Sequence, residues 1–461
     1  MTRTQHLEVE HTYAPPPGTE VPALAGPGGL PGVARVAEPV VHELHATYHD
    51  TGGLALTAAG ITLRARTGGP DEGWHLKLPA PGGREELHHR LGRGETVPAR
   101  LRGLVTAWTQ GEPLSPVATV ATRRTSRSLL AEDGTVLAEL ADDEVTGTPV
   151  GGAPVSWREW ELELVEGGPD LLAAADELFE GLGVEPRPLA RKIAVALGDR
   201  LPQVPEVADP VLRAVAADVG VLKLLDSRWR RGEPVAGELA SVVRRIRAAL
   251  WTLRPGWGRT VTGPVRAELA WLSESLVEAA ELAAAHERVL AVLEEEREGV
   301  APVRRLLRAA FEEHEREAAA RVLDDLQADR YLALLRSLDR VVAEPASEEP
   351  LTRKQLRRRL EKARTKASAR TGEDEGRYTP ARHLAAAEHL ADVADLVEPV
   401  VGKEARRARR WAEQAVEGLE DACTTLRAQQ EVGAVATRAA TTGEAFLLGR
   451  LHGRLEVRLA G

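Results

Sequence analysis

The 461-residue sequence contains one cysteine, Cys423, and one methionine, Met1. A single cysteine excludes an intrachain disulfide and any site built from several thiolates, and it is typical of a reducing compartment. Uninterrupted apolar runs of ~18 residues, which a membrane-spanning helix needs, are absent. The first residues lead directly into a charged, alternating segment without the apolar core of a signal peptide. We therefore expect a cytoplasmic protein with no membrane partner.

An excess of positive charge is also lacking. Sixty Lys and Arg residues face 70 Asp and Glu residues, which gives a formal net charge of −10. A chain with this balance binds nucleic acid poorly without specific contacts, so no specific nucleic-acid partner is expected. Any site for a polyanion must then be a local concentration of Arg and Lys. Hydrophobic residues make up 43% of the chain, enough to form buried cores and to argue against global disorder.

The residues that are present divide the chain into two domains. Residues 1–200 are rich in Gly and Pro and show short period-two alternation, which predicts an antiparallel sheet. A proline-bearing stretch over 201–208 predicts a linker. Residues 209–461 are rich in Ala, Leu, Arg and Glu with helical periodicity, which predicts an all-helical domain that can form two four-helix bundles. The predicted helices lie near 209–228, 235–254, 263–296, 301–342, 350–369, 379–400, 403–430 and 433–457.

The charged side chains of the predicted strands are sorted by sign. Carboxylates alone alternate with apolar residues in the first and last strands, whereas the middle strands carry Arg and Lys. The residues concerned are Glu8, Glu10, Glu159, Glu161 and Glu163 on the acidic strands and Arg64, Arg66 and Lys77 on the basic ones. An ordinary sheet with one solvated face gives the same alternation. A closed barrel with these faces inward would instead place acids and bases in one lumen, where each needs a counter-ion or a ligand.

That lumen would have a recognisable chemistry. Carboxylate oxygens hold hard divalent cations, and guanidinium and ammonium groups hold phosphate. The combination suits a metal-bound polyphosphate.

The same strands carry motifs in the order of a known family. Glu8-Val9-Glu10 resembles the opening Glu-x-Glu-x-Lys signature of the CYTH, or triphosphate tunnel metalloenzyme, superfamily. The resemblance continues to about residue 200 through Tyr48-His49-Asp50-Thr51, Leu63-Arg64-Ala65-Arg66, His75-Leu76-Lys77, Thr122-Arg123-Arg124, Ala141-Asp142-Asp143-Glu144 and Glu159-Trp160-Glu161. It implies an α+β protein whose N-terminal domain is an antiparallel eight-stranded β-barrel, or tunnel.

The resemblance also implies roles for individual residues. Phosphates would be held by Arg64, Arg66, Lys77, Arg124 and Lys192. Mg²⁺ or Mn²⁺ would be held by Glu8, Glu10, Glu159 and Glu161, with Asp143 and Glu163 as further candidates. Glu8 and Glu10 would be catalytic, because the metal neutralises developing charge and positions or activates a water for attack on the terminal phosphate.

Two positions depart from the family pattern. Thr12 replaces the lysine that ends the signature, and Thr122 replaces a basic residue two positions before Arg124. Losing one such contact in the transition state typically lowers a rate roughly 10²-fold or more. Two functions are therefore open: a metal-dependent phosphohydrolase for inorganic triphosphate or another triphosphorylated substrate, and a weakly catalytic or non-catalytic regulator that binds polyphosphate or nucleotide. Adenylate cyclase chemistry on ATP would use the same tunnel but needs base contacts that the sequence does not reveal.

The helical domain carries dense basic segments. Residues 351–370 contain nine Arg or Lys and one acid, Glu361. Such helix faces are often solvated and paired with Glu at helical spacing. The segment from Val243 to Pro255 resembles the signature helix of the CHAD domain, and 268–276 and 398–402 match it further. This resemblance covers about residues 209–457.

The CHAD resemblance implies two pseudo-symmetric four-helix bundles that line a basic groove for inorganic polyphosphate. Arg244, Arg245, Arg247 and Arg382 are the candidate polyphosphate-binding residues, with His389 as a further candidate. Several other expected basic or histidine positions hold neutral or acidic residues: Gly237, Ala240, Ala381, Ala385, Glu388 and Ala391. These losses should weaken affinity for a phosphate polymer, since that binding is largely electrostatic.

Overall fold

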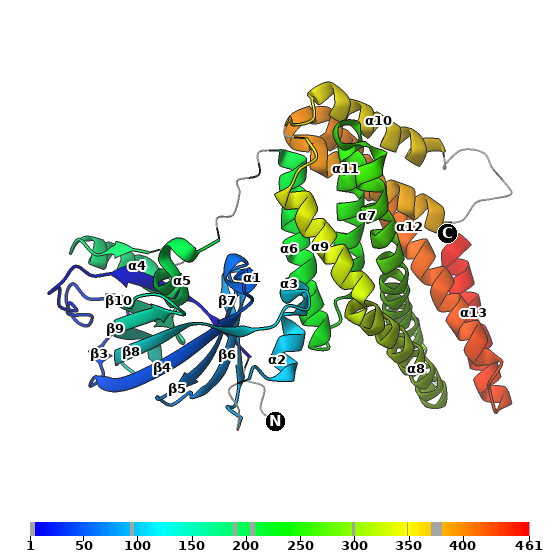
Figure 1. The fold of residues 1–461 in the computed structure, drawn as a ribbon. Coiled ribbons are helices and arrows are strands. Elements are labelled where there is room, and N and C mark those ends of the chain that lie inside the picture. Colours follow the sequence, from blue (N-terminus) through cyan, green and yellow to red (C-terminus); the bar gives the residue numbers. More distant parts are fainter. Residues whose placement is uncertain are drawn as a thin grey trace. The chain divides into compact units, whose positions relative to one another are not determined.

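A computed structural model describes residues 5–92, 96–187, 191–202, 207, 209–296, 300–347, 349–369 and 380–460. The chain divides into two compact units, residues 1–204 and 205–461, and Figure 1 shows the elements of each. Part of the predicted linker, residues 203–206 and 208, lies outside the described residues. Among the helices described, none combines the length and the apolar character needed to cross a bilayer.

The first unit is built on one antiparallel sheet. The order of its strands is β1-β7-β6-β5-β4-β8-β9-β10-β2-β11, and β3 pairs with β8. The strands are β1 (Gln5–Glu8), β2 (Glu10–Ala14), β3 (Arg35–Val36), β4 (Val40–Asp50), β5 (Thr62–Thr67), β6 (Gly73–Ala80), β7 (Gly83–His89), β8 (Ser115–Leu130), β9 (Val136–Pro149), β10 (Val155–Leu164) and β11 (Glu185–Pro186).

The sheet curls until its two ends meet at the first strand. Only Val9 separates β1 from β2, yet β1 pairs with β7 and β2 pairs with β10. In register, Glu8 faces Arg84 and Glu10 faces Glu163. The curled antiparallel sheet and the α+β class are as predicted. The joining strand changes partner halfway along, so its first half closes one side of the ring and its second half closes the other.

The apolar side chains of the strands face outward, toward the helices that cover the sheet. Trp160 and Leu162 of β10 and Tyr13 of β2 are fully buried beneath helix α4 (Pro169–Glu180). Phe179 of α4 packs edge-on against both aromatic rings, with centroids 4.7 Å from Tyr13 and 5.2 Å from Trp160. Because α4 covers the apolar face, the opposite, charged parity is left for the inside of the curl. The ordinary sheet with a solvated charged face is therefore not what these strands form.

Short helices complete the first unit. They are α1 (Ala55–Ala58), α2 (Ala99–Leu104), α3 (Thr106–Thr109), α5 (Lys192–Leu197) and a 3-10 turn at Gly198–Arg200. Helix α5 packs on β8 and β9 and begins at Lys192, which brings that lysine to the sheet.

The second unit is all-helical over its described residues. Its helices are α6 (Pro210–Arg230), α7 (Ala236–Glu294), α8 (Val300–Gln327), α9 (Asp329–Ala343), α10 (Arg353–Ala369), α11 (Pro380–Val401), α12 (Lys403–Ala436) and α13 (Thr442–Ala460). Helix α7 contacts α6, α8 and α9 and also α11 and α12, so it links the first four helices to the last four.

The segments 235–254 and 263–296 are two helices, as predicted; both belong to the element labelled α7, and a kink at Gly258 separates them. Arg266 donates to the carbonyl of Arg247 at 3.1 Å, so the two halves of α7 lie side by side. The predicted helix 301–342 is instead broken at Ala328, which has extended backbone angles. No proline or glycine marks that break, which is why the pattern missed it.

The kink in α7 yields a stability prediction. Gly258 has φ 79° and ψ 169°, a region that is nearly restricted to glycine. We expect Gly258→Ala to lower the free energy of unfolding by about 1–3 kcal/mol. Gly263→Ala is the matched control, because a Cβ there meets nothing within 4 Å in a helical segment, and it should stabilise by about 0.5–1 kcal/mol. Urea unfolding of the full chain measures both, and equal effects would contradict the assignment.

Candidate functional site

A cavity of about 170 Å³ lies inside the curled sheet. Apart from Tyr48 and Thr62, every residue that lines it carries an ionisable charge. The charged lining residues are Glu8, Glu10, Arg64, Arg66, Asp71, Lys77, Arg84, Glu86, Arg124, Glu161, Glu163, Arg191 and Lys192. Strands that are far apart in the sequence thus bring their acids and bases to one place.

The cavity gathers most of the residues singled out by sequence. Glu159 and Asp143 differ, since both are fully buried and neither lines the cavity. The sequence analysis did not single out Arg84 and Glu86 of β7. Both faces of the segment 84–89 carry polar residues, so the strand shows no alternation of apolar and polar residues. The Pro81-Gly82-Gly83 turn is the signal that could have found them, since it predicts a hairpin that places Glu86 opposite Lys77.

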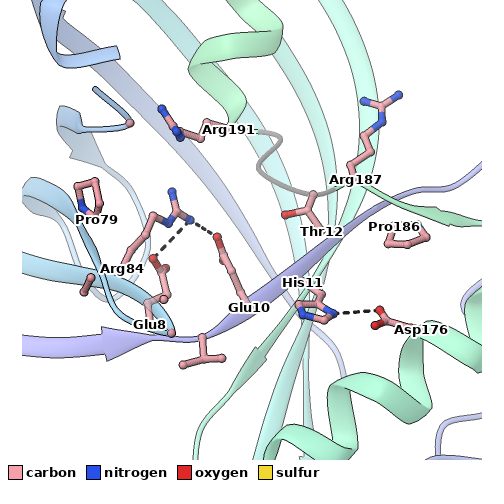
Figure 2. Close-up of a pocket in the computed structure, with 15 residues that line it drawn as sticks. Glu8, Glu10, His11, Thr12, Pro79, Arg84, Asp176, Pro186, Arg187 and Arg191 are labelled. Carbon is pink, nitrogen blue, oxygen red and sulfur yellow. Dashed lines mark hydrogen bonds and ion pairs between the residues drawn. The ribbon is translucent and has the colours of Figure 1, made fainter. Parts of the chain in front are cut away.

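The first group of carboxylates is Glu8, Glu10 and Glu163. One oxygen from each lies within 4.8 Å of the others. Lys77 contacts Glu8, and Arg84 contacts Glu10 and lies 3.5 Å from Glu8, as Figure 2 shows for Arg84. Arg84 approaches Glu8 Oε2 as an ion pair without a hydrogen bond. Glu8 Oε2 is buried without a hydrogen-bond partner among the described residues.

The electrostatics of this group show a shortage of positive charge. Burial, followed by the charges of Glu8 and Glu10, raises the pKa of Glu163 to about 7. Burial and the charge of Glu161 raise the pKa of Glu10 as well. Three carboxylates whose oxygens lie this close together fit a hard divalent cation by donor type and number.

The second group, Asp143, Glu159 and Glu161, already surrounds a cation. The Lys192 ammonium lies 2.5 Å from Glu159, 2.5 Å from Glu161 and 3.0 Å from Asp143. Arg124 adds a two-pronged contact to Asp143, at 2.8 and 2.6 Å, and a contact of 2.5 Å to Glu161. Although burial acts the other way, the charges of Lys192 and Arg124 hold the pKa of Glu161 well below its usual range. The lysine therefore occupies the position at which a metal would lie.

The guanidinium groups of Arg64 and Arg66 form the anion side of the cavity. The Nε atom of each is buried without a hydrogen-bond partner among the described residues. Arg64 donates to Tyr48 at 3.1 Å, and Arg66 contacts Asp71. Burial, with the repulsion of Arg64 and Arg124, lowers the pKa of Arg66 to about 10. Buried cations that repel one another and keep unused donors define a place for an anion.

The helical unit holds a second charged cavity, of about 780 Å³. Its predicted residues divide into two kinds. Arg244 pairs with Asp392 at 2.5 Å and Arg245 pairs with Asp218 at 2.6 Å, whereas Arg247 lines the cavity without a carboxylate partner among the described residues. Arg382 is exposed and lies outside the lining.

Sequence reasoning missed most of the basic cluster at this cavity. Arg359 is 8% exposed and stacks on Trp251 at 3.3 Å from the ring centroid, and Arg266 and Lys366 line the cavity. Burial, with the charges of Arg254 and Arg266, lowers the pKa of Arg359 to about 10. These residues lie on α7 and α10, so only the packing of the two helices brings them together.

Comparisons with known proteins place both units. A family model described as CYTH domain matches residues 22–192, and one described as CHAD domain matches 213–432. A Mycobacterium tuberculosis protein, "Uncharacterized protein Rv2226", is 34% identical over 408 residues, covering 81% of this chain and 78% of its own. "Uncharacterized protein MT2285" from another strain of that species gives the same values. A solved structure, PptA from Streptomyces chartreusis, is 21% identical with a TM-score of 0.37, covering 55% of this chain and 93% of its own.

The fold and the charged cavity define the class of protein: it is a phosphate-binding protein of the triphosphate-tunnel type with an appended helical domain. The chain belongs to the family of proteins that join a CYTH domain to a CHAD domain. The CYTH match begins after β2 and does not cover Glu8 and Glu10, which line the cavity in the structure. Members of this domain family generally depend on a metal, and the carboxylate groups here can bind one.

The helical cavity predicts a pH dependence of stability. Burial, with the charges of Lys366, Arg266, Arg359 and Arg247, lowers the pKa of His389 from 6.5 to about 3. His389 therefore takes up a proton near pH 6.5 in the unfolded chain but stays neutral in the folded chain until about pH 3. The free energy of unfolding consequently falls as the pH decreases from about 6.5 toward 3, by up to about 1.4 kcal/mol per pH unit.

His389→Gln should remove this contribution. The difference in free energy of unfolding between wild type and variant, measured from pH 7 to pH 4, isolates it because other groups cancel. A difference that does not change with pH would contradict the assignment.

Proposed function

We propose that the first unit is a metal-dependent phosphohydrolase that acts on inorganic triphosphate or another triphosphorylated compound. One observation carries the proposal: within one cavity, the buried Nε donors of Arg64 and Arg66 have no hydrogen-bond partner among the described residues, and oxygens of three carboxylates, Glu8, Glu10 and Glu163, lie within 4.8 Å of one another. A metal-bound triphosphate satisfies both at once, since it supplies oxygens to the guanidinium groups and a cation to the carboxylates.

Phosphate binding falls to the cations around the cavity. Arg64 and Arg66 would hold phosphate oxygens directly, with Lys77, Arg84, Arg124 and Lys192 alongside them. Asp143 and Glu159 are buried and do not line the cavity. Asp143 accepts from Arg124 and Glu159 contacts Lys192, so the two acids hold these cations in position. We therefore propose a positioning role for Asp143 and Glu159 in place of the metal-binding role expected for both.

Metal binding falls to Glu8, Glu10 and Glu163, which share one wall of the cavity. When bound, Mg²⁺ or Mn²⁺ supplies charge neutralisation at the phosphate oxygens and a more acidic water. In the hydrolysis, water adds a hydroxyl group to the terminal phosphorus. The bond from that phosphorus to the bridging oxygen breaks, the shorter phosphate chain keeps the oxygen, and a proton is released.

A second candidate function is binding without efficient turnover. Thr12 and Thr122 are both buried and uncharged, at 9% and 5% exposure. Arg124 and Lys192 are also already paired with carboxylates, so a ligand must compete for them. Phosphate release from tripolyphosphate with Mg²⁺ or Mn²⁺ separates the two functions: release supports the enzyme, and tight binding without release supports the sensor.

For the helical unit we propose an auxiliary role in binding phosphate polymers. Arg247, Arg266 and Lys366, for which the described part of the chain shows no carboxylate partner, would carry it. Arg244 and Arg245 are held by Asp392 and Asp218 and would contribute less. A cytoplasmic location stays a prediction.

Arg64 offers a direct test of the anion site. Its side chain contacts Tyr48 and no carboxylate in the described structure, so Arg64→Ala leaves no buried acid unpaired. We expect kcat/KM for triphosphate to fall about 10²–10³-fold, the usual effect of removing one preorganised donor.

Arg123→Ala is the matched control for Arg64→Ala. Arg123 is half exposed and pairs loosely with Glu43 and Glu144 on the outer face, so activity should stay within about twofold of wild type. Equal losses in both variants, with unchanged thermal unfolding, would refute the assignment of Arg64.

The two carboxylate groups can be separated by metal binding alone. Glu163→Gln should raise the Kd for Mn²⁺, measured without phosphate, by about tenfold or more. Glu159→Gln should change it by less than about threefold, because Lys192 already occupies that group. The reverse order of effects would place the metal at Glu159.

A further inference from the structure

Helices α10, α11 and α12 of the helical unit, labelled in Figure 1, form a groove of about 900 Å³. Among the described residues, none lines both this groove and the helical cavity of about 780 Å³. None of the residues to which a function is assigned above lines the groove either. Buried Leu360, Leu390 and Ala408 give the groove an apolar part.

The aromatic residue of the groove is Trp411 of α12, which is 40% exposed. A single exposed apolar residue is common on protein surfaces, so the exposure of Trp411 alone carries no argument. Here, however, the indole lines a groove together with apolar side chains and the guanidinium groups of Arg364 and Arg407. Proteins that bind single-stranded nucleic acid combine these features, because bases stack on aromatic rings while cations hold the phosphates.

The surface around the groove has a local excess of positive charge. Its acids are already paired, since Glu361 lies 3.0 Å from Arg364 and Glu404 lies 2.8 Å from Arg357. In the described part of the chain, no carboxylate pairs with the other exposed cations of α10 and of residues 403–411. These cations are Arg353, Lys354, Arg358, Lys362, Lys366, Lys403, Arg407 and Arg410.

The spacing of these cations is regular. Lys354, Arg358 and Lys362 are four residues apart, so they form a basic track on one side of α10, with a rise of about 6 Å between neighbours. On α12, Arg407 and Trp411 are also four residues apart, which places a cation beside the indole. A track of separate charges beside an aromatic ring suits a polymer in which phosphates alternate with sugars that carry bases. In inorganic polyphosphate the phosphates share oxygens, and no group stacks on an indole.

We propose that the groove and the basic track bind single-stranded nucleic acid without base specificity. One base would stack on Trp411, and phosphates would contact Arg407 and the cations of α10. The chain as a whole is acidic, with a net charge of −10, so the attraction must come from this local concentration of Arg and Lys. The proposal goes beyond the functions proposed for either unit and requires neither the tunnel nor the helical cavity.

The direct test is the fluorescence anisotropy of a labelled, mixed-sequence DNA strand of about 20 nucleotides, which is longer than a typical single-strand site. The strand is titrated with the full chain and compared with the duplex of the same sequence. We expect the single strand to bind at least about tenfold more tightly, because its bases are free to stack. Equal or tighter binding of the duplex, or no binding of the single strand at low salt, would overturn the proposal.

Trp411→Ala separates base stacking from attraction to phosphate. It should weaken binding of the single strand by about 5- to 100-fold, the usual range for loss of one stacked base, while Trp411→Phe retains most of the affinity. Phe446→Ala is the matched control, since Phe446 is a 64% exposed aromatic residue on α13, and it should change the Kd by less than about twofold. Trp411→Ala should also leave the Kd for long-chain polyphosphate within about twofold. Equal losses for the single strand and for polyphosphate would show a site for phosphate alone and refute the proposal.

Arg358→Ala tests the basic track independently of the indole. It should lower the slope of log Kd against log salt concentration by about 0.7, the value for one phosphate contact to a single strand. Arg308→Ala, at an exposed arginine of α8, should leave the slope unchanged. Equal slopes for Arg358→Ala and the wild type would contradict the placement of the strand along α10.

Discussion

The first unit depends on one electrostatic constraint: acids and bases buried in the same lumen must neutralise each other or a ligand. Removing a charge from water is expensive, and an unpaired buried charge is more expensive than a buried pair. Asp143, Glu159 and Lys192 meet the constraint within the protein, and their mutual contacts leave little for a ligand to add. Glu8, Arg64 and Arg66 meet it less fully: among the described residues the buried Nε atoms of Arg64 and Arg66 have no hydrogen-bond partner, and Glu8 Oε2 has only the Arg84 guanidinium at 3.5 Å. The function proposed for the unit lies in this second set.

The same constraint explains the division of labour among the carboxylates. A carboxylate that lines the cavity can exchange its protein partner for a metal, whereas one behind the wall can only hold its partner in place. Glu163 and Glu159 are four residues apart on one strand and carry the same functional group. Their surroundings differ, since Glu163 lies among acids and Glu159 lies against Lys192.

The helical unit meets a similar constraint differently. Several of its arginines are held by carboxylates, and the positions of expected basic residues hold Gly237, Ala240 and Glu388 around the same cavity. Among the described residues, a compact basic cluster lies at Trp251 and His389. The packing of α7 on α10 and α11 maintains this cluster, because apolar periodicity does not depend on the charges.

The sequence by itself determined the two domain types, the antiparallel sheet and most of the cavity residues, because alternation and helical periodicity are local properties of the chain. It also placed Glu8 and Glu10, two residues apart, on one face. Only the tertiary structure decided that β1 and β2 have different partners and that Lys192 lies among Asp143, Glu159 and Glu161. The closure of the whole sheet sets which distant strands pair and how α5 approaches β9. Local sequence patterns do not predict these long-range contacts.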